Sequence, residues 1–161
     1  MAYLTIIAAI GQNKELGYKN ALIWSLPNDL RFFKKQTEHK KIVMGYNTFL
    51  SLPKLLPNRK HIVLTSRKIL HPEVLCFSSF NDLFNYLNSL SEEVMIIGGA
   101  SIYQLFLPYS QELLLTLIQQ QALADTFFPN FNEALYEKQL LDEQNENGIT
   151  YQHVRYLKKS S

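Results

Sequence analysis

Short, uninterrupted runs of apolar residues, rich in Ile, Val and Leu, recur along this chain between polar stretches. Continuous rather than alternating hydrophobicity is typical of strands that are covered on both faces, as in a mostly parallel sheet. We therefore predict buried strands at residues 4–10, 42–44, 62–64, 94–97 and 113–118.

Helical patterns fall between these runs. Apolar side chains recur at helical spacing from Phe80 to Leu90, and Ser79 with Asp82 forms a capping-box-like start. Near the end, Asn147-Gly148 predicts a hairpin turn between a segment at 136–141 and a run at 150–157. The alternation predicts an α/β fold: a central, mostly parallel twisted sheet with an antiparallel C-terminal hairpin and helices on both faces.

Length and composition restrict the class of protein. A chain of 161 residues predicts a single domain, 1–161, with one core. The single cysteine, Cys76, allows neither an internal disulfide nor a thiolate cluster for zinc, which favours a reducing cytoplasm. The apolar start is too short to cross a membrane and is a poor signal peptide.

Charge and histidine spacing favour a small-molecule partner. The net charge of +2 leaves no basic stripe for nucleic acid. The four histidines are scattered without the helical spacing of metal ligands, so we interpret each as a surface or structural residue and predict no metal site. They are His39, His61, His71 and His153.

Asp29 is the only acid in the apolar run 23–30, which leads into Phe32-Phe33. Pro27 fits a first helical position, so Asp29 falls in the first turn with Phe33 one turn later on the same face. Burial among apolar side chains disfavours the charged form of a carboxyl group, as a catalytic acid requires. The alternative is an acid that complements the helix dipole and stays solvated.

Three predicted strands end in residues that suit phosphate groups. Gly45 with Thr48, and the pair Gly98-Gly99, stand where a strand meets a helix, so main-chain amides can donate to an anion. Neither segment is a GxGxxG motif, and a plain tight turn remains the alternative for Gly45. The third strand ends in hydroxyls and cations at 65–68, which suit a phosphate monoester or form a solvated loop.

Taken in order, these segments resemble dihydrofolate reductase over residues 3 to 157. The segments that carry the resemblance are Gly17 to Leu30 with Trp24 and Asp29, Met44-Gly45 with Thr48, Leu56-Pro57-Asn58-Arg59, Thr65-Ser66, Ile96 to Tyr103, and Asp125-Thr126-Phe127-Phe128-Pro129.

The resemblance implies reduction of dihydrofolate by NADPH, with hydride passing to C6 and a proton to N5. Asp29 resembles the acid that hydrogen-bonds the pteridine and promotes protonation, and Thr116 resembles the hydroxyl that supports it. The implied catalytic set is Leu22, Trp24, Asp29, Tyr103 and Thr116.

The same resemblance implies two binding surfaces. Apolar walls surround the substrate, Arg59 resembles the clamp for its glutamate α-carboxylate, and the implied substrate set is Ile7, Ala8, Asp29, Leu30, Phe33, Ser51, Leu52, Leu56, Arg59, Ile97 and Thr116. The implied NADPH set is Ala9, Ile10, Gly17, Asn20, Leu22, Gly45, Tyr46, Asn47, Thr48, Leu64, Thr65, Ser66, Arg67, Ile97, Gly98, Gly99, Ala100, Ser101, Ile102, Tyr103 and Thr126.

The resemblance also implies a mobile lid at 11–26, a monomer, and antifolate inhibitors as further ligands. Three departures affect details: Ile23 stands where most relatives have proline, Tyr46 where arginine is common, and Ser101 where some relatives have a basic residue.

Two alternative functions remain open. A related pterin or pyrimidine reductase, such as the reductase domain of riboflavin synthesis, needs neither Asp29 nor Arg59, and a silent nucleotide-binding module has no use for the acid.

Overall fold

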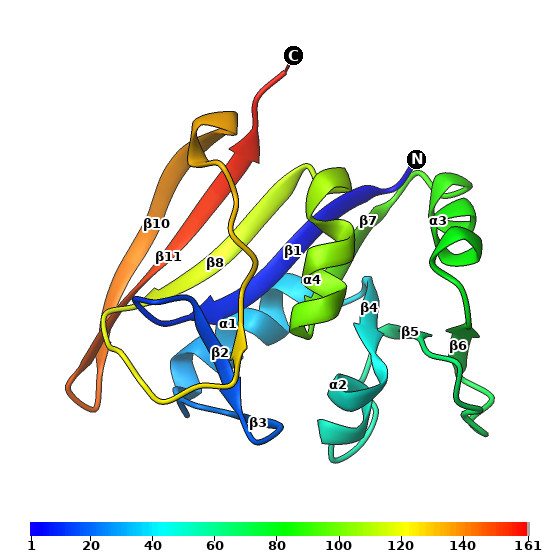
Figure 1. Ribbon diagram of the computed structural model, residues 1–161, viewed down its shortest axis with the longest axis horizontal. Helices are drawn as coiled ribbons and strands as arrows, with labels where there is room; N and C mark the ends of the chain where they lie inside the picture. Colours follow the sequence, from blue (N-terminus) through cyan, green and yellow to red (C-terminus); the bar gives the residue numbers. More distant parts are fainter. Residues whose placement is uncertain (161) are drawn as a thin grey trace.

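The computed structural model describes residues 1–160, and an eight-stranded sheet forms its centre (Figure 1). The strand order is β10-β11-β8-β1-β7-β4-β5-β6. The six parallel strands are β1 (Tyr3–Ile10), β4 (Lys41–Gly45), β5 (Lys60–Leu64), β6 (Val74–Phe77), β7 (Glu93–Gly98) and β8 (Glu112–Ile118). All five strands predicted from apolar runs are confirmed, and β6 is an addition.

The C-terminal hairpin is also confirmed. It consists of β10 (Tyr136–Glu146) and β11 (Ile149–Lys158), joined at Asn147 and Gly148, whose φ values of 55° and 80° suit a two-residue hairpin turn. β10 is longer than the predicted segment 136–141, and its pairing with β11 shifts register between Leu140 and Asp142. β11 runs antiparallel to β8, which completes the predicted mostly parallel sheet.

Helices cover both faces of the sheet, as predicted. One apolar core packs against α3 (Phe80–Asn88) and α4 (Ala100–Phe106), and the other against α1 (Pro27–Thr37) and α2 (Tyr46–Ser51). Figure 1 shows α4 in front of β1 and β7, with α1 behind the sheet. Two short 3-10 helices, η1 (Leu107–Tyr109) and η2 (Glu133–Leu135), complete the helical elements of residues 1–160.

Two predicted helix starts are confirmed. The Ser79 hydroxyl accepts from the Asp82 amide at 3.1 Å and caps α3, and Pro27 opens α1 with Asp29 in its first turn. The start of α1 lies beside the carboxyl ends of β1 and β8, since Asp29 lines one pocket with Ala9 of β1 and Ile118 of β8. This arrangement places Asp29 near Thr116 of the central sheet.

Two strands of a second, three-stranded sheet lie in the predicted lid at 11–26, and the third lies outside it. The sheet has the order β3-β2-β9 and consists of β2 (Glu15–Tyr18), β3 (Ala21–Leu22) and, outside the lid, β9 (Thr126–Phe127). These strands have only two to four residues each, too few for a hydrophobic period. In the described part of the chain, no helix has the length and apolar character needed to span a membrane.

Candidate active site

Asp29 stands at the edge of a small pocket beside the carboxyl ends of β1 and β8. Its side chain is 18% exposed, so the carboxyl group is neither in bulk water nor fully enclosed. The pocket brings together residues from β1, the lid, α1 and β8, which are Ala9, Leu16, Leu22, Ile23, Trp24, Leu26, Asp29 and Ile118. Three of the five predicted catalytic residues, Asp29, Trp24 and Leu22, thus share one pocket.

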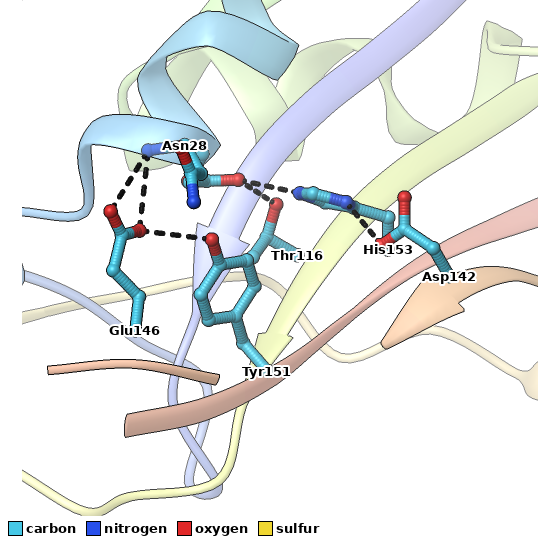
Figure 2. Close-up of polar contacts among 7 residues, drawn as sticks. Asn28, Thr116, Asp142, Glu146, Tyr151 and His153 are labelled. Atoms are coloured by element: carbon cyan, nitrogen blue, oxygen red, sulfur yellow. Dashed lines mark hydrogen bonds and ion pairs between the residues drawn. The ribbon is translucent and has the colours of Figure 1, made fainter. Parts of the chain in front are cut away.

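Two side chains lie within hydrogen-bond distance of the same oxygen of Asp29. The Thr116 hydroxyl lies 2.6 Å from Asp29 Oδ1, and His153 Nε2 lies 2.9 Å from it. Thr116 and His153 are register partners on neighbouring strands, so the sheet presents both to α1 (Figure 2). The predicted Thr116 contact is present in the structure, whereas the His153 contact was not foreseen from the sequence.

His153 is only 1% exposed and is therefore not a surface residue. Its Nδ1 lies 2.8 Å from Asp142 Oδ1 (Figure 2). Its ring stacks on Phe32, with the centroids 3.7 Å apart and the planes 9° from parallel. Burial alone would lower the pKa of His153, but the hydrogen bonds and charges of Asp29 and Asp142 outweigh it and raise that pKa. The ring therefore favours its charged form.

A distant carboxylate caps the start of α1. Both oxygens of Glu146 lie 3.2 Å from the Asn28 amide, and the Tyr151 hydroxyl donates to Glu146 at 3.0 Å (Figure 2). Leu26, at the position before the helix, provides no side-chain cap. The hairpin thus satisfies a free helical amide and complements the helix dipole, which fixes the turn that carries Asp29.

Trp24 packs over Gly11, where a Cβ atom would meet its ring at 2.5 Å. The indole Nε1 donates to Gln120 Oε1 at 3.2 Å, which ties the lid to the loop after β8. The same loop is held by Glu15, whose buried carboxylate accepts from the amides of Asn13 and Ala122 at 2.6 and 2.7 Å. Burial alone would raise the pKa of Glu15, but these main-chain hydrogen bonds prevail and lower it. Leu22 itself is exposed.

The predicted substrate walls are largely brought together. Phe33, Leu52 and Leu56 are partly buried against a cluster that contains Ile7 and Ile97. Leu30, by contrast, is exposed. Ala8 lies in the core on the other face, and the exposed Ser51 donates its hydroxyl to the Thr48 carbonyl at 2.6 Å.

Arg59 is held by the last turns of α1 and by its own loop. Its Nε donates to the Thr37 hydroxyl at 3.0 Å, and its terminal nitrogens donate to the carbonyls of Pro57 and Lys34. A guanidinium has five N–H donors, so two stay free for a carboxylate. His61 is buried behind this loop, and its Nε2 accepts from the Leu56 amide at 3.0 Å, a structural role as predicted.

The Gly98-Gly99 junction packs against Tyr103. Gly98 has a φ of 113°, and a Cβ there would lie 2.9 Å from the Tyr103 hydroxyl. That buried hydroxyl donates to the carbonyls of Ile7 and Ile97 at 2.8 and 2.9 Å, and burial raises the pKa of Tyr103. Tyr103 thus fastens β1 to β7, and its proton is already engaged.

Around Gly99 the backbone stays open. A Cβ there would have a single neighbour within 4 Å, the Thr48 hydroxyl at 3.7 Å. Gly45, by contrast, lies under Ile102, where a Cβ would come within 3.1 Å of the Ile102 side chain. The two predicted glycine junctions therefore lie side by side, at the carboxyl ends of the neighbouring strands β4 and β7.

Tyr46 lies beside Arg67, with the guanidinium 5.2 Å from the ring centroid, and the Arg67 amide donates to the Thr65 hydroxyl at 3.0 Å. The other predicted cofactor residues are spread over the lid and the carboxyl edge of the sheet. Leu64 and Ala100 are partly buried and Ile10 is buried, whereas Asn20, Asn47, Ser66, Ser101 and Thr126 are exposed. Gly17 and Thr126 are partners across the small sheet, and a Cβ at Gly17 would lie 3.0 Å from the Thr126 hydroxyl.

Comparisons with known proteins agree on one family. The family model for dihydrofolate reductase matches residues 3–158. Dihydrofolate reductase of Bacillus subtilis is 36% identical over 162 residues, covering 98% of this chain and 96% of that protein. That of Buchnera aphidicola subsp. Baizongia pistaciae is 35% identical over 164 residues, covering 97% and 98%. A solved dihydrofolate reductase from Enterococcus faecalis, complexed with NADP(H) and RAB-propyl, matches with a TM-score of 0.87 and 29% identity, covering 98% of this chain and 97% of that one.

Proposed function

Because the chain belongs to the dihydrofolate reductase family, we propose that it reduces 7,8-dihydrofolate to 5,6,7,8-tetrahydrofolate with NADPH, by hydride transfer to C6 and protonation at N5. The observation that carries this proposal is the carboxyl group of Asp29 in a pocket beside Trp24 and Leu22, with Thr116 as a donor at 2.6 Å. A binding module would not need a partly buried acid there, since its burial costs free energy.

The substrate is held by residues of α1 and the following loops. Asp29 accepts hydrogen bonds from the pteridine and promotes N5 protonation, which proceeds through water. Phe33, Leu52 and Leu56 contact the flat rings, in keeping with their shared cluster. The two free N–H groups of Arg59 suit a bidentate contact with the glutamate α-carboxylate. Antifolates would occupy the same pocket.

The residues at the carboxyl edge of the sheet fit NADPH. The open backbone at Gly99 and the hydroxyl of Thr48 suit the pyrophosphate, while Thr65, Ser66 and Arg67 suit the 2′-phosphate. Bound NADPH supplies the hydride, and the protein contributes alignment and electrostatics.

The lid would close the site against water. Trp24 and Leu22 belong to it, and Glu15 and Asp125 anchor its two arms, since the Asp125 carboxylate accepts from the Lys19 amide at 2.9 Å. Exclusion of water strengthens electrostatic interactions in the pocket. Ile23 lacks the restraint of proline, so we expect the lid to be less restrained when open.

The proposal also places the protein in one-carbon metabolism, supporting thymidylate and purine synthesis, as a monomeric cytoplasmic enzyme.

The direct test is loss of the reduced-nicotinamide absorbance when purified protein meets dihydrofolate and NADPH. We expect turnover with dihydrofolate and none with the pyrimidine substrate of the riboflavin-synthesis reductase. Absence of NADPH oxidation with dihydrofolate would refute the proposal and favour the silent binding module. Turnover of the pyrimidine alone would favour the related reductase.

Arg67→Ala tests the cofactor assignment. Loss of one charged hydrogen bond is worth about 1.5 to 3 kcal/mol, so the preference for NADPH over NADH should narrow by roughly 10-fold or more. The measurement is kcat/KM with each cofactor, with the exposed Lys159→Ala as the control for loss of a cation. Equal efficiency of the wild type with both cofactors would contradict the assignment.

A further inference from the structure

We propose that His153 is a positioning residue for the proposed reaction: an imidazolium, held between Asp142 and Asp29, that orients the Asp29 carboxylate and sets the pH range of dihydrofolate reduction. The inference rests on the proposed function. It begins from a chain of three side chains in which the buried His153 lies between Asp142 and Asp29, with contacts of 2.8 and 2.9 Å. The chain joins the substrate pocket to the hairpin edge, where Asp142 is 43% exposed.

The two contacts identify the charge state in which both are attractive. An ionised carboxylate only accepts hydrogen bonds, and a neutral imidazole has a single N–H. A neutral ring between Asp29 and Asp142 would therefore turn a lone pair toward one of the two carboxylates. The imidazolium has a donor on each nitrogen and satisfies both, with charge-assisted hydrogen bonds.

Packing keeps the ring in this orientation. Phe32 stacks on one face of the imidazole at 3.7 Å, and Tyr151 meets it edge-on with centroids 5.5 Å apart. The ring cannot turn without losing the stack, so each nitrogen stays aimed at its carboxylate. A cation against an aromatic face gains further attraction, which again favours the charged ring.

The charges around the ring are mainly negative. Asp29 of α1 and Asp142 of β10 contact it directly, and Glu146 of β10 lies one step further through the Tyr151 hydroxyl. The neighbour from β8 is the neutral hydroxyl of Thr116. Arg155, two residues along β11, is bound through Nε to Glu112 at 2.9 Å. His153 is therefore the cation that offsets the negative charges at this end of the sheet.

The arrangement at Asp29 explains how the ring acts on the reaction. Thr116 and His153 both donate to Oδ1, so Oδ2 is left for a ligand in the pocket. The imidazolium also adds a positive charge beside the carboxylate that promotes protonation of the substrate. That charge disfavours proton binding at both the carboxylate and a nearby heterocycle.

The first test is the charge of the ring, read from the ¹⁵N shifts of the His153 side chain in the ligand-free wild type. We expect both nitrogens to carry protons at neutral pH, and a lower deprotonation midpoint in Asp142→Asn. A neutral ring at neutral pH, or a midpoint that Asp142→Asn leaves unchanged, would overturn the proposal. This test does not depend on whether a His153 variant folds.

The second test is the pH profile of kcat/KM for dihydrofolate in His153→Phe, which keeps a ring against Phe32. Loss of a cation within hydrogen-bond distance should move the midpoint to higher pH by about 1 to 3 pH units. The control is His39→Asn, which removes an exposed imidazole and should leave the profile unchanged. A His153→Phe profile that overlays the wild type would overturn the role.

The proposed function and the role of His153 can be refuted separately. A wild type that does not reduce dihydrofolate overturns the proposed function. An active wild type with a neutral His153 ring overturns only the role given to His153.

Discussion

His153 and His61 are both 1% exposed, yet their surroundings drive them to opposite charge states. His153 lies between two carboxylates, and its pKa is raised. His61 accepts a hydrogen bond from the Leu56 amide, and burial, together with the positive charge of Arg59, lowers its pKa. Burial alone therefore does not set the charge of a histidine, because the chemistry of its partners decides whether the desolvation cost is offset.

The two regions also differ in what they hold. His153 contacts the proposed catalytic acid, whereas His61 fixes the loop that carries Leu56 and Arg59. We interpret the first region as one that handles charge during the reaction and the second as a rigid support for the substrate walls. Each of the following changes tests one side of this contrast.

The largest effect is expected for Asp29→Asn. It keeps the shape of the side chain but removes its proton-handling group, which should lower kcat/KM at neutral pH by roughly 10²- to 10⁴-fold. The loss should shrink at acidic pH, where dihydrofolate arrives already protonated. Steady-state kinetics across pH measure this, with Asp82→Asn, an exposed carboxylate in the first turn of α3, as the control. Near-normal activity of Asp29→Asn would reject its role.

On the other side of the contrast, His61→Phe should act on stability. Removing the acceptor leaves the Leu56 amide without its partner, at a cost of about 1 to 3 kcal/mol in the free energy of unfolding. Urea denaturation measures the cost, and kinetics should show a raised KM for dihydrofolate with little change in kcat. A fall in kcat without a change in KM would contradict the purely structural role that we assign to His61.

The free energy of unfolding should depend on pH in opposite directions at the two sites. The contribution of His153, whose pKa is raised, is complete below the unfolded-state value of about 6.5 and is lost as pH rises through the folded value. The contribution of His61, whose pKa is lowered, is present above about 6.5 and is lost as pH falls through the folded value. A tenfold change in proton affinity corresponds to about 1.4 kcal/mol.

Urea unfolding at several pH values checks these slopes. The stability difference between the wild type and His153→Phe should fall as pH rises, and the difference for His61→Phe should rise. Parallel slopes would remove the contrast between the two regions.

The smallest effect is expected for Glu146→Gln, at the edge of the His153 region. The amide oxygen can still accept from the Asn28 N–H, so only the charge at the helix start is lost, worth about 0.3 to 1 kcal/mol. Thermal unfolding at low and high salt should show a difference that shrinks as salt screens it. Glu143→Gln, on an exposed part of the same strand, is the control.

Much of the fold could be predicted because the chain signals it locally. Buried parallel strands produce continuous apolar runs, and Asn147-Gly148 marks its turn by residue type alone. The small lid sheet could not be predicted, since two-residue strands have no period and depend on pairing with β9, more than a hundred residues away along the chain.

In the candidate site, too, one part could be predicted from the sequence and another could not. Asp29 stands out as an acid in an apolar run, but its contact with His153 joins residues 124 positions apart, and no local pattern reports it. One signal was available: counting outward from the two-residue turn pairs Asp142 with His153. The predicted segment stopped at residue 141, so this pairing was missed. The docking of α1 on β11 requires the tertiary structure.

The reliance of Asp29 on the C-terminal hairpin has a consequence for synthesis of the protein. At about 5 to 20 residues per second, the ribosome needs roughly 6 to 25 seconds to travel from residue 29 to residue 153. During that time Asp29 of the nascent chain lacks its contact with the His153 imidazole, even if other strands of the sheet have already formed. We therefore expect catalytic activity to arise late in synthesis, when β11 pairs with β8, and not to increase gradually as the chain emerges.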